Sequence, residues 1–283
     1  MSTIRPAAVA GMFYPDDPSE LRAMLRAMLS EAAAEMSTET SEEPAPKAII
    51  VPHAGYVYSG PIAASAYARL RPAAARVRRV VLIGPCHRVA VRGLAVSAAD
   101  AFATPLGAVP VDRPAIAALL ALPFVQCLDV AHQAEHSLEV HLPFLQSVLG
   151  DFTLVPVVAG EASAAEVAAV LERLWGGKET LIVISSDLSH FLPYDAALQI
   201  DRRTCMAIER LDPAAITWEQ ACGRMPVSGL LLAAKRHGLA VTTLDLRNSG
   251  DTAGDRRRVV GYGAWVFTAV AEALRQPARA PGQ

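Results

Sequence analysis

The sequence predicts an α/β fold, a three-layer α/β/α sandwich with helices on both faces of a mostly parallel or mixed central sheet. Short apolar runs of strand length alternate along the chain with segments whose apolar residues recur at helical spacing. Three of those runs, at 48–51, 80–83 and 181–184, are each followed by a histidine. With 283 residues and 52% apolar content, the chain can bury a sizeable core. We therefore expect a single domain over residues 1–270.

The predicted elements follow from these patterns in chain order. An amphipathic helix begins after the acidic and capping residues at 16–20 and carries apolar residues at helical spacing through Leu29. Residues 36–46 are polar, acidic and rich in proline, which predicts a mobile loop, and residues 271–283 are expected to form a disordered tail. The predicted strands are 48–51, 79–83, 93–97, 152–158, 180–184, 241–246 and 261–270. The predicted helices are 61–70, 113–122, 137–149, 164–175, 195–211 and 226–237.

Composition and charge argue against several classes of protein. A net charge of -2 with a single short arginine run, 256–258, predicts no nucleic-acid partner. No apolar run approaches the ~20 residues that a membrane helix needs, and residues 1–11 do not resemble a signal peptide, so we expect a cytoplasmic protein that does not cross a membrane. The four cysteines are scattered, which indicates neither a disulfide framework nor a zinc ribbon.

Three histidines, His53, His87 and His190, follow predicted strands and should reach the same edge of the sheet. In open α/β sheets ligands bind outside the carboxyl ends of the strands. Neutral imidazole is a ligand for iron, copper and zinc, and histidine is also the usual general base near neutral pH. The alternative is that each ring only caps a strand. Asp187 lies three residues before His190 and could orient that ring or simply form the turn.

The segment 135–141 contains two histidines but does not match a zinc-protease motif. His136 and His141 are five residues apart, which is about 140° around a helix and prevents both from chelating one ion. Glu135 or His136 could face the pocket, whereas His141 is expected to be a hydrogen-bonded core residue. His132 and His237 are expected at the surface.

Cys222 lies in a glycine-containing turn just before a helix predicted to begin near residue 226. A helix amino terminus lowers a thiol pKa and favours thiolate, which suits a nucleophile or a metal ligand. The alternative is a small buried hydrophobic residue, and spacing alone does not separate Cys222 from the other three cysteines.

Seven motifs, spread in order from about residue 5 to 270, resemble those of the Memo family, whose prokaryotic members are called AmmeMemoRadiSam system protein B. The motifs are Ala10-Gly-Met-Phe-Tyr14, Pro52-His-Ala-Gly-Tyr56-x-Tyr58-Ser-Gly60, Gly84-Pro-x-His87, Glu135-His-Ser-x-Glu-x-His-Leu-Pro143, Ser185-Ser-Asp-Leu-Ser-His190, Ala221-Cys-Gly223 and Asn248-Ser-Gly-Asp-Thr-x-Gly254.

The resemblance implies a fold similar to class III extradiol dioxygenases and a candidate site. His53 and His87 would match metal ligands, and Cys222 would stand where a ring-cleaving enzyme has its carboxylate ligand. His190 would match the active-site histidine, with Asp187 beside it. The residues expected to contact a substrate around this site are Tyr56, Tyr58, Glu135 and His136.

The resemblance also implies one transition-metal ion, Fe(II) or copper in the first place and zinc in the second, a redox role, and AMMECR-type and radical SAM partner proteins. It conveys no settled substrate. The function we expect is metal-dependent redox or oxygenase-like chemistry on a small molecule or peptide, without catechol ring cleavage because a thiol replaces the carboxylate. One alternative is a non-catalytic module that binds a peptide or partner in the old pocket. Another is a hydrolase with Cys222 as nucleophile and His190 as base.

Overall fold

The computed structural model describes residues 3–35 and 45–269. Within these ranges a nine-stranded mixed sheet forms the centre of the molecule. The predicted tail 271–283 and all but the last two residues of the predicted loop 36–46 lie outside the described residues.

The middle of the sheet is parallel and its edges are mixed. Strands β2 (Ala48–Val51), β9 (Thr180–Ser185), β3 (Arg79–Pro85) and β8 (Thr153–Ala159) lie side by side in this order and run parallel. On one side β12 (Val259–Ala269) pairs antiparallel with β2 and also pairs with β10 (His190–Leu192) and β11 (Leu239–Asn248). On the other side β4 (Leu94–Val96) pairs antiparallel with β8 and parallel with β7 (Val125–Cys127).

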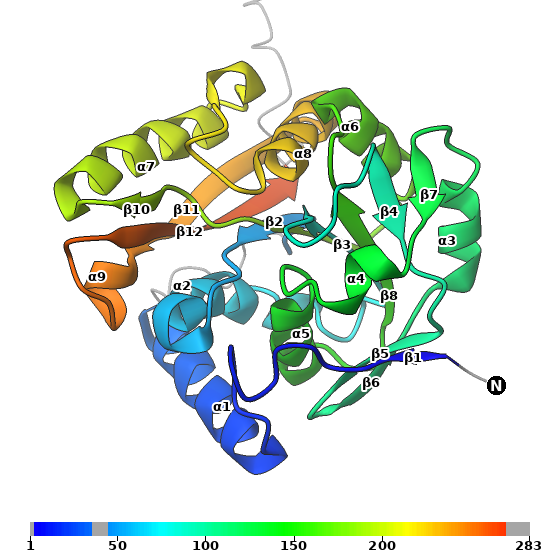
Figure 1. Ribbon diagram of the computed structural model, residues 1–283, viewed down its shortest axis with the longest axis horizontal. Coiled ribbons are helices and arrows are strands. Elements are labelled where there is room, and N and C mark those ends of the chain that lie inside the picture. Colours follow the sequence, from blue (N-terminus) through cyan, green and yellow to red (C-terminus); the bar gives the residue numbers. More distant parts are fainter. Residues whose placement is uncertain (1–2, 36–44, 270–283) are drawn as a thin grey trace, which may run out of the picture.

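Helices cover both faces of this sheet, so the predicted three-layer α/β/α architecture is confirmed (Figure 1). On one face α1 (Pro18–Glu35), α2 (Tyr56–Ala68) and α5 (Leu142–Val148) pack together. On the other face lie α6 (Ala164–Arg173), α7 (Tyr194–Glu209) and α8 (Arg224–His237), with α3 (Arg113–Leu119) beside α6. The remaining described strands and α-helices are short: the three-stranded sheet β1 (Ile4–Arg5), β5 (Ala101–Thr104) and β6 (Gly107–Pro110), and the helices α4 (Val130–Gln133) and α9 (Ser249–Thr252). Short 3₁₀ segments lie at Arg71–Ala73, Glu139–His141 and Pro213–Ala215.

The core follows from the apolar runs in the sequence. Every residue of β2 and β9 is buried, as expected for parallel strands covered on both faces. On α1 the apolar residues at helical spacing, Leu21, Leu25 and Leu29, turn toward this core. The layers are therefore held together by aliphatic contacts, and polar side chains collect at the strand ends.

Two predicted helices have different boundaries in the structure. The helix predicted at 61–70 begins at Tyr56 instead, because Pro61 lies in its second turn, where the missing N–H removes only one helical hydrogen bond. The helix predicted at 137–149 is replaced by a turn, the 3₁₀ segment Glu139–His141 and then α5. The Glu135 carboxylate accepts the backbone N–H groups of His136 and Ser137, which holds this stretch in the turn.

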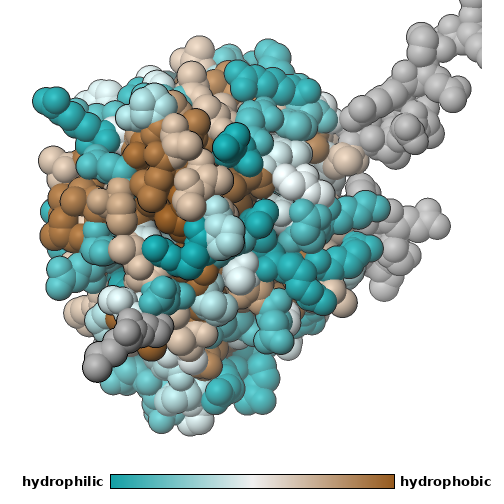
Figure 2. Space-filling model, turned by 90° about the vertical axis from the view of Figure 1, so that its right-hand side faces the viewer, coloured by the Kyte–Doolittle hydropathy of each residue, from teal (hydrophilic) through white to brown (hydrophobic). Residues whose placement is uncertain are grey.

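The outer surface is mixed in character. Figure 2 shows the side of the molecule at the right of Figure 1, where hydrophobic groups gather in part of the surface and are interrupted and bordered by hydrophilic ones. In residues 3–35 and 45–269, no helix combines the length and apolar character that crossing a bilayer requires.

Candidate metal centre

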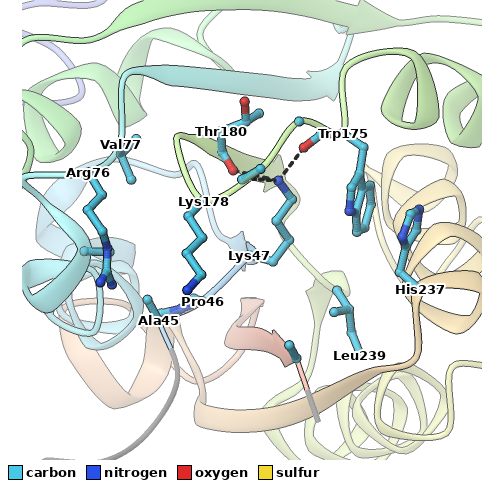
Figure 3. Close-up of a pocket in the computed structure, with 14 residues that line it drawn as sticks. Ala45, Pro46, Lys47, Arg76, Val77, Trp175, Lys178, Thr180, His237 and Leu239 are labelled. Carbon is cyan, nitrogen blue, oxygen red and sulfur yellow. Dashed lines mark hydrogen bonds between the residues drawn. The ribbon is translucent and has the colours of Figure 1, made fainter. Parts of the chain in front are cut away.

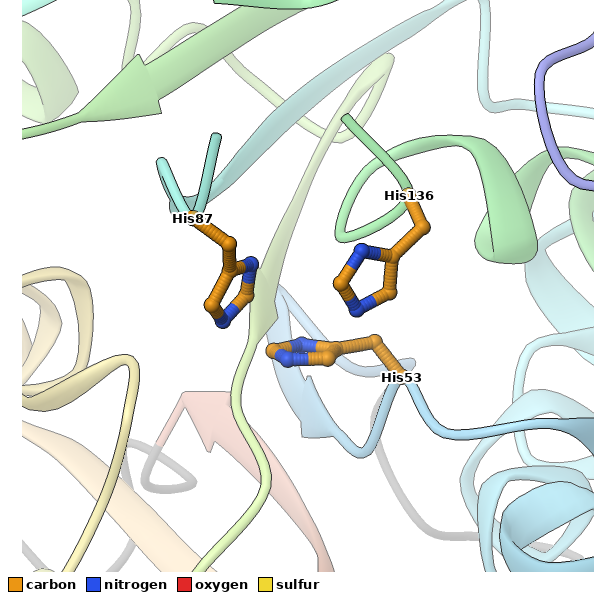
Figure 4. Close-up of side chains that lie close together, drawn as sticks. All are labelled: His53, His87 and His136. Carbon is orange, nitrogen blue, oxygen red and sulfur yellow. The ribbon is translucent and has the colours of Figure 1, made fainter. Parts of the chain in front are cut away.

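Three histidine rings converge at the carboxyl ends of the parallel strands. His53 follows β2 by two residues, His87 follows β3 by two residues, and His136 comes from the turn before the 3₁₀ segment. One nitrogen atom of each ring lies within 4.8 Å of the other two (Figure 4). We call these three residues the imidazole cluster. The sheet order explains the approach of the first two, because β9 alone separates β2 from β3.

The His53 ring is oriented by a buried chain of hydrogen bonds. Ser185, the last residue of β9, donates its hydroxyl proton to the Ser137 carbonyl over 2.6 Å. Its oxygen must therefore accept from both His53 Nδ1, at 2.6 Å, and His141 Nε2, at 2.8 Å. The other nitrogen of His141 accepts from the Tyr67 hydroxyl at 2.9 Å. His53 thus carries its proton on Nδ1 and presents the lone pair of Nε2 to the cluster.

The His87 ring is oriented by Glu135. Its Nδ1 lies 2.9 Å from Glu135 Oε1, and its backbone N–H donates to Oε2 of the same carboxylate. Burial opposes ionisation of Glu135, but the hydrogen bonds and charge of His87 outweigh it and lower the pKa of this carboxyl to about 2. A carboxylate on one ring nitrogen leaves the other free, which is the usual arrangement of a metal-bound histidine.

His136 has the least protein support of the three rings. Its Nδ1 is buried and lies 3.3 Å from Glu135 Oε1, but it has no hydrogen-bond partner among the residues that the structure describes. The ring stacks on His87 with centroids 4.8 Å apart. Burial lowers the pKa of His136, and burial together with the neighbouring imidazoles lowers the pKa of His53 well below its usual range. Both rings are therefore neutral at pH 7, the form that binds a metal ion.

Cys222 lies beside the imidazole cluster but outside the group of three close nitrogens. Its Sγ is 3.3 Å from His53 Nε2 and 3.6 Å from the Asp187 carbonyl oxygen. The close approach depends on Gly223, where an added Cβ would meet the Ser185 carbonyl oxygen at 2.5 Å. The expectation that a helix amino terminus lowers the pKa of this thiol is wrong. Burial raises the pKa, and the nearby Asp187 adds to this effect.

Asp187 and His190 are placed differently from one another. Asp187 is buried, and its Oδ1 accepts the backbone N–H of His53 at 2.7 Å while Oδ2 lies 4.0 Å from His53 Nε2. Burial raises the pKa of Asp187. His190 is exposed, and its Nδ1–H donates to the Leu188 carbonyl at 2.8 Å. The His190 ring is therefore oriented by a backbone carbonyl, whereas Asp187 forms a hydrogen bond with the backbone of His53.

Of the four residues expected to contact a substrate, three make other contacts within the protein. Tyr56 is buried, and its hydroxyl donates to the Val140 carbonyl at 2.6 Å, so it belongs to the core. Glu135 is also buried and bonds the protein rather than a ligand. His136, expected in the pocket wall, is instead a member of the imidazole cluster. Tyr58, with 40% of its surface exposed on α2, remains free to contact a ligand.

The other histidines divide between core and surface. His141 is a hydrogen-bonded core residue, as predicted. The expectation that His132 is a surface group is wrong, because it is 2% exposed, with Nε2 on the Ala95 carbonyl. His237 is partly exposed and stacks on Trp175. Sequence reasoning included Ser185 in a motif but gave it no role, although a serine at the end of the strand between two histidine-bearing strands is a usable signal.

A cavity of about 210 Å³ adjoins Cys222. Its wall includes Pro85 at the end of β3, the exposed Trp218 and the half-buried Arg224. Within the described part of the chain, the Arg224 guanidinium makes no hydrogen bond or ion pair. The surroundings of the cluster thus offer space and one unpaired cation.

Comparison with known proteins gives the family of the chain. The family model described as "Memo-like protein" matches residues 5–266. A MEMO1 family protein of Aquifex aeolicus is 36% identical over 276 residues, covering 93% of this chain and 99% of that protein. Proteins of the same description from Ignicoccus hospitalis and Methanococcoides burtonii are 37% and 38% identical, covering 93% and 92% of this chain and 98% of each relative. The match includes every strand end that supplies the imidazole cluster, and the chain belongs to the Memo-like protein family.

Proposed function

We propose that the protein binds one transition-metal ion at His53 and His87, with His136 or Cys222 as a third ligand. The observation that supports this is the convergence of three imidazole nitrogens within 4.8 Å. Two of the rings have their outer nitrogen held by Ser185 or Glu135. Such partners fix the ring orientation, which a cluster without a ligand would not need.

The donor set favours a particular group of metals. Imidazole nitrogen and cysteine sulfur bind iron, copper and zinc, whereas Mg²⁺ and Ca²⁺ prefer oxygen ligands. Together with the family resemblance, this leads us to propose Fe(II) or copper before zinc. When bound, such an ion would supply one-electron or oxygenase-like redox chemistry.

The residues around the cluster have roles that follow from their contacts. His190 holds its proton on Nδ1, so its Nε2 is available to accept a proton from a substrate. Arg224 lines the adjoining cavity without a protein partner and would attract an anionic group of a substrate. We propose His190 as the acid or base of the site and this cavity as the place of a small molecule or peptide end. Cooperation with AMMECR-type and radical SAM proteins is part of the same proposal and depends on the family resemblance.

Metal analysis and electron paramagnetic resonance of anaerobically purified protein test this function. We expect close to one ion per chain, and a sharp loss in His53→Ala and His87→Ala. His237→Ala and Cys127→Ala are matched controls, because neither residue touches the cluster. Comparison of His136→Ala with Cys222→Ala identifies the third ligand. Full metal content in His53→Ala would disprove the site.

Two further outcomes separate this function from the alternatives. A protein that stays metal-free after exposure to Fe(II), Cu and Zn, yet binds a peptide near Cys222, would be a binding module. Fe(II)-loaded protein should give no ring-opened product from simple catechols in air, and robust iron-dependent cleavage would contradict the role given to Cys222.

A further inference from the structure

A second cavity in the described part of the chain lies at the opposite edge of the sheet from the imidazole cluster. Its volume is about 560 Å³, within the range of small-molecule sites. Lys47 directly precedes β2, Thr180 opens β9, Leu239 opens β11 and Ala269 ends the antiparallel β12, and all four line it. The cavity therefore lies beyond the amino ends of the parallel strands, and a ligand here would not reach the metal centre.

One wall of the cavity is held rigidly by Lys47. The Lys47 ammonium donates to the carbonyls of Trp175, Gly177 and Thr180, using all three of its protons. Gly176, inside this turn, has φ +56°, and a Cβ there would meet Thr180 Oγ1 at 2.3 Å. The turn is therefore a built feature of the fold, with a partly buried positive charge behind it. Burial lowers the pKa of Lys47 to about 8.

A flat aromatic surface belongs to the same wall. The rings of Trp175 and His237 stack with centroids 3.7 Å apart and an interplanar angle of 8°. His237 is fixed from behind by a 2.8 Å contact between Nε2 and Glu172 Oε2. Figure 3 shows this stack on one side of the cavity, with the Lys47 side chain between it and Lys178.

Two cations on the far side of the cavity have no counter-charge. Figure 3 places Arg76 and Lys178 across from the aromatic stack. Neither side chain makes a hydrogen bond or ion pair with any residue in 3–35 or 45–269, and no carboxylate from those ranges lines the cavity. In a chain of net charge -2, Arg76 and Lys178 form a local excess of positive charge, next to Lys47, whose own charge interacts with Glu179.

We propose that this cavity is a binding site for a small organic anion with a flat aromatic part, such as an aryl carboxylate, sulfonate or phosphate ester. The stacked rings of Trp175 and His237 suit the flat part, and the guanidinium and ammonium groups opposite suit the anion. The site is separate from the proposed metal function, so either can fail without the other.

The test uses the full chain and 1-anilinonaphthalene-8-sulfonate, a fluorescent aryl sulfonate. We expect one saturable class of site whose affinity falls as salt is added, and weaker binding of the uncharged N-phenyl-1-naphthylamine. Arg76→Glu/Lys178→Glu should weaken sulfonate binding at least about tenfold, because attraction becomes repulsion. The affinity of the milder variant Arg76→Gln/Lys178→Gln should lie between those of the charge-reversed variant and the parent protein.

The matched control is Arg22→Glu/Arg26→Glu, which makes the same charge change at exposed positions of α1 outside the cavity. Its affinity should stay within about twofold of the parent, and His53→Ala should also bind normally. Circular dichroism verifies that each variant is folded. Absence of saturable binding, or equal weakening by the two charge-reversed variants, would overturn the site.

Discussion

Two buried polar regions lie within a few residues of each other and have opposite hydrogen-bonding states. The first surrounds Glu139, which is fully buried. One carboxylate oxygen accepts from Val9 N and the Tyr14 hydroxyl, and the other from Ala8 N and the Arg5 guanidinium. The guanidinium also donates to two backbone carbonyls, so the region is closed and saturated.

The second region is the imidazole cluster, which is less completely hydrogen-bonded. The outer nitrogens of His53 and His87 are bonded, but His53 Nε2 has only the weakly donating Cys222 thiol at 3.3 Å, and His136 Nδ1 has no hydrogen-bond partner among the described residues. Unsatisfied buried polar groups are costly and persist mainly where function needs them. The Glu139 region is therefore complete without a ligand, whereas the three nitrogens of the imidazole cluster lie close enough together to hold a metal ion.

The largest effect on stability is expected from a variant that disrupts the hydrogen bonds around Glu139. Glu139→Ala leaves the Arg5 charge buried without its carboxylate counter-charge and should lower the free energy of unfolding by about 3–5 kcal/mol. Urea denaturation measures it. The double variant Arg5→Met/Glu139→Leu should cost clearly less, because no charge is left alone. A loss below about 1 kcal/mol in Glu139→Ala would show that the pair is unimportant.

Acid should destabilise the protein through histidines that lie outside the imidazole cluster. Burial lowers the pKa of His132 to about 4 and that of His141 well below its usual range. Both are protonated in the unfolded chain below pH 6.5 but stay neutral when folded, so stability is full above pH 6.5 and is lost as the pH falls toward 4. His132 alone accounts for about 3 kcal/mol.

Urea titrations of metal-free protein at pH 7.5 and 4.5 measure this loss. His132→Gln should reduce the difference between the free energies of unfolding at the two pH values, although it lowers both. An equally steep pH dependence in that variant would assign the effect to other groups.

A smaller effect is expected for a change at Glu135, which borders the imidazole cluster. Glu135→Gln replaces one carboxylate oxygen by a donor and should lower metal affinity about 10–100-fold while the chain stays folded. Competition with a coloured chelator measures the affinity. Glu172→Gln is the matched control, because Glu172 holds His237 outside the cluster. Equal losses in both variants would contradict the role of Glu135.

The smallest structural effect is expected for His190→Ala. Its exposed ring bonds only the Leu188 carbonyl, so stability should change by less than about 0.5 kcal/mol and metal content should remain. Substrate turnover or ligand affinity should fall, as measured once a ligand is found. Loss of metal as complete as in His53→Ala would make His190 a ligand.

The sequence predicted the layered architecture and the strand-end histidines because both depend on local patterns. Continuous apolar runs indicate buried parallel strands. Because the carboxyl ends of parallel strands meet at one edge of the sheet, His53 and His87 were expected close together. The resemblance added Cys222, which the structure indeed places beside His53. The position of His136 was not predictable in this way. It depends on Glu135 reaching back to the His87 backbone, a contact between residues 48 positions apart.

Other elements escaped prediction for related reasons. The strands β1, β5 and β6 are two to four residues long and have no apolar run that distinguishes them from loops. His132 lies in a short segment of mixed polar and apolar residues but is covered by Phe102 from the small sheet, 5.9 Å away between ring centroids. Burial imposed by a distant segment leaves no local signal.

The hydrogen bonds from His53 and from Tyr67 through His141 meet at the Ser185 oxygen, whose own proton goes to the Ser137 carbonyl, and this sets the proton stoichiometry of metal uptake. Because the proton of His53 is already on Nδ1, binding at Nε2 displaces none. A cysteine must lose its proton to bind a metal. At pH 8, uptake through imidazoles alone should therefore release no proton, whereas participation of Cys222 should release about one per ion. A pH-stat titration thus distinguishes the two candidate third ligands without any mutation.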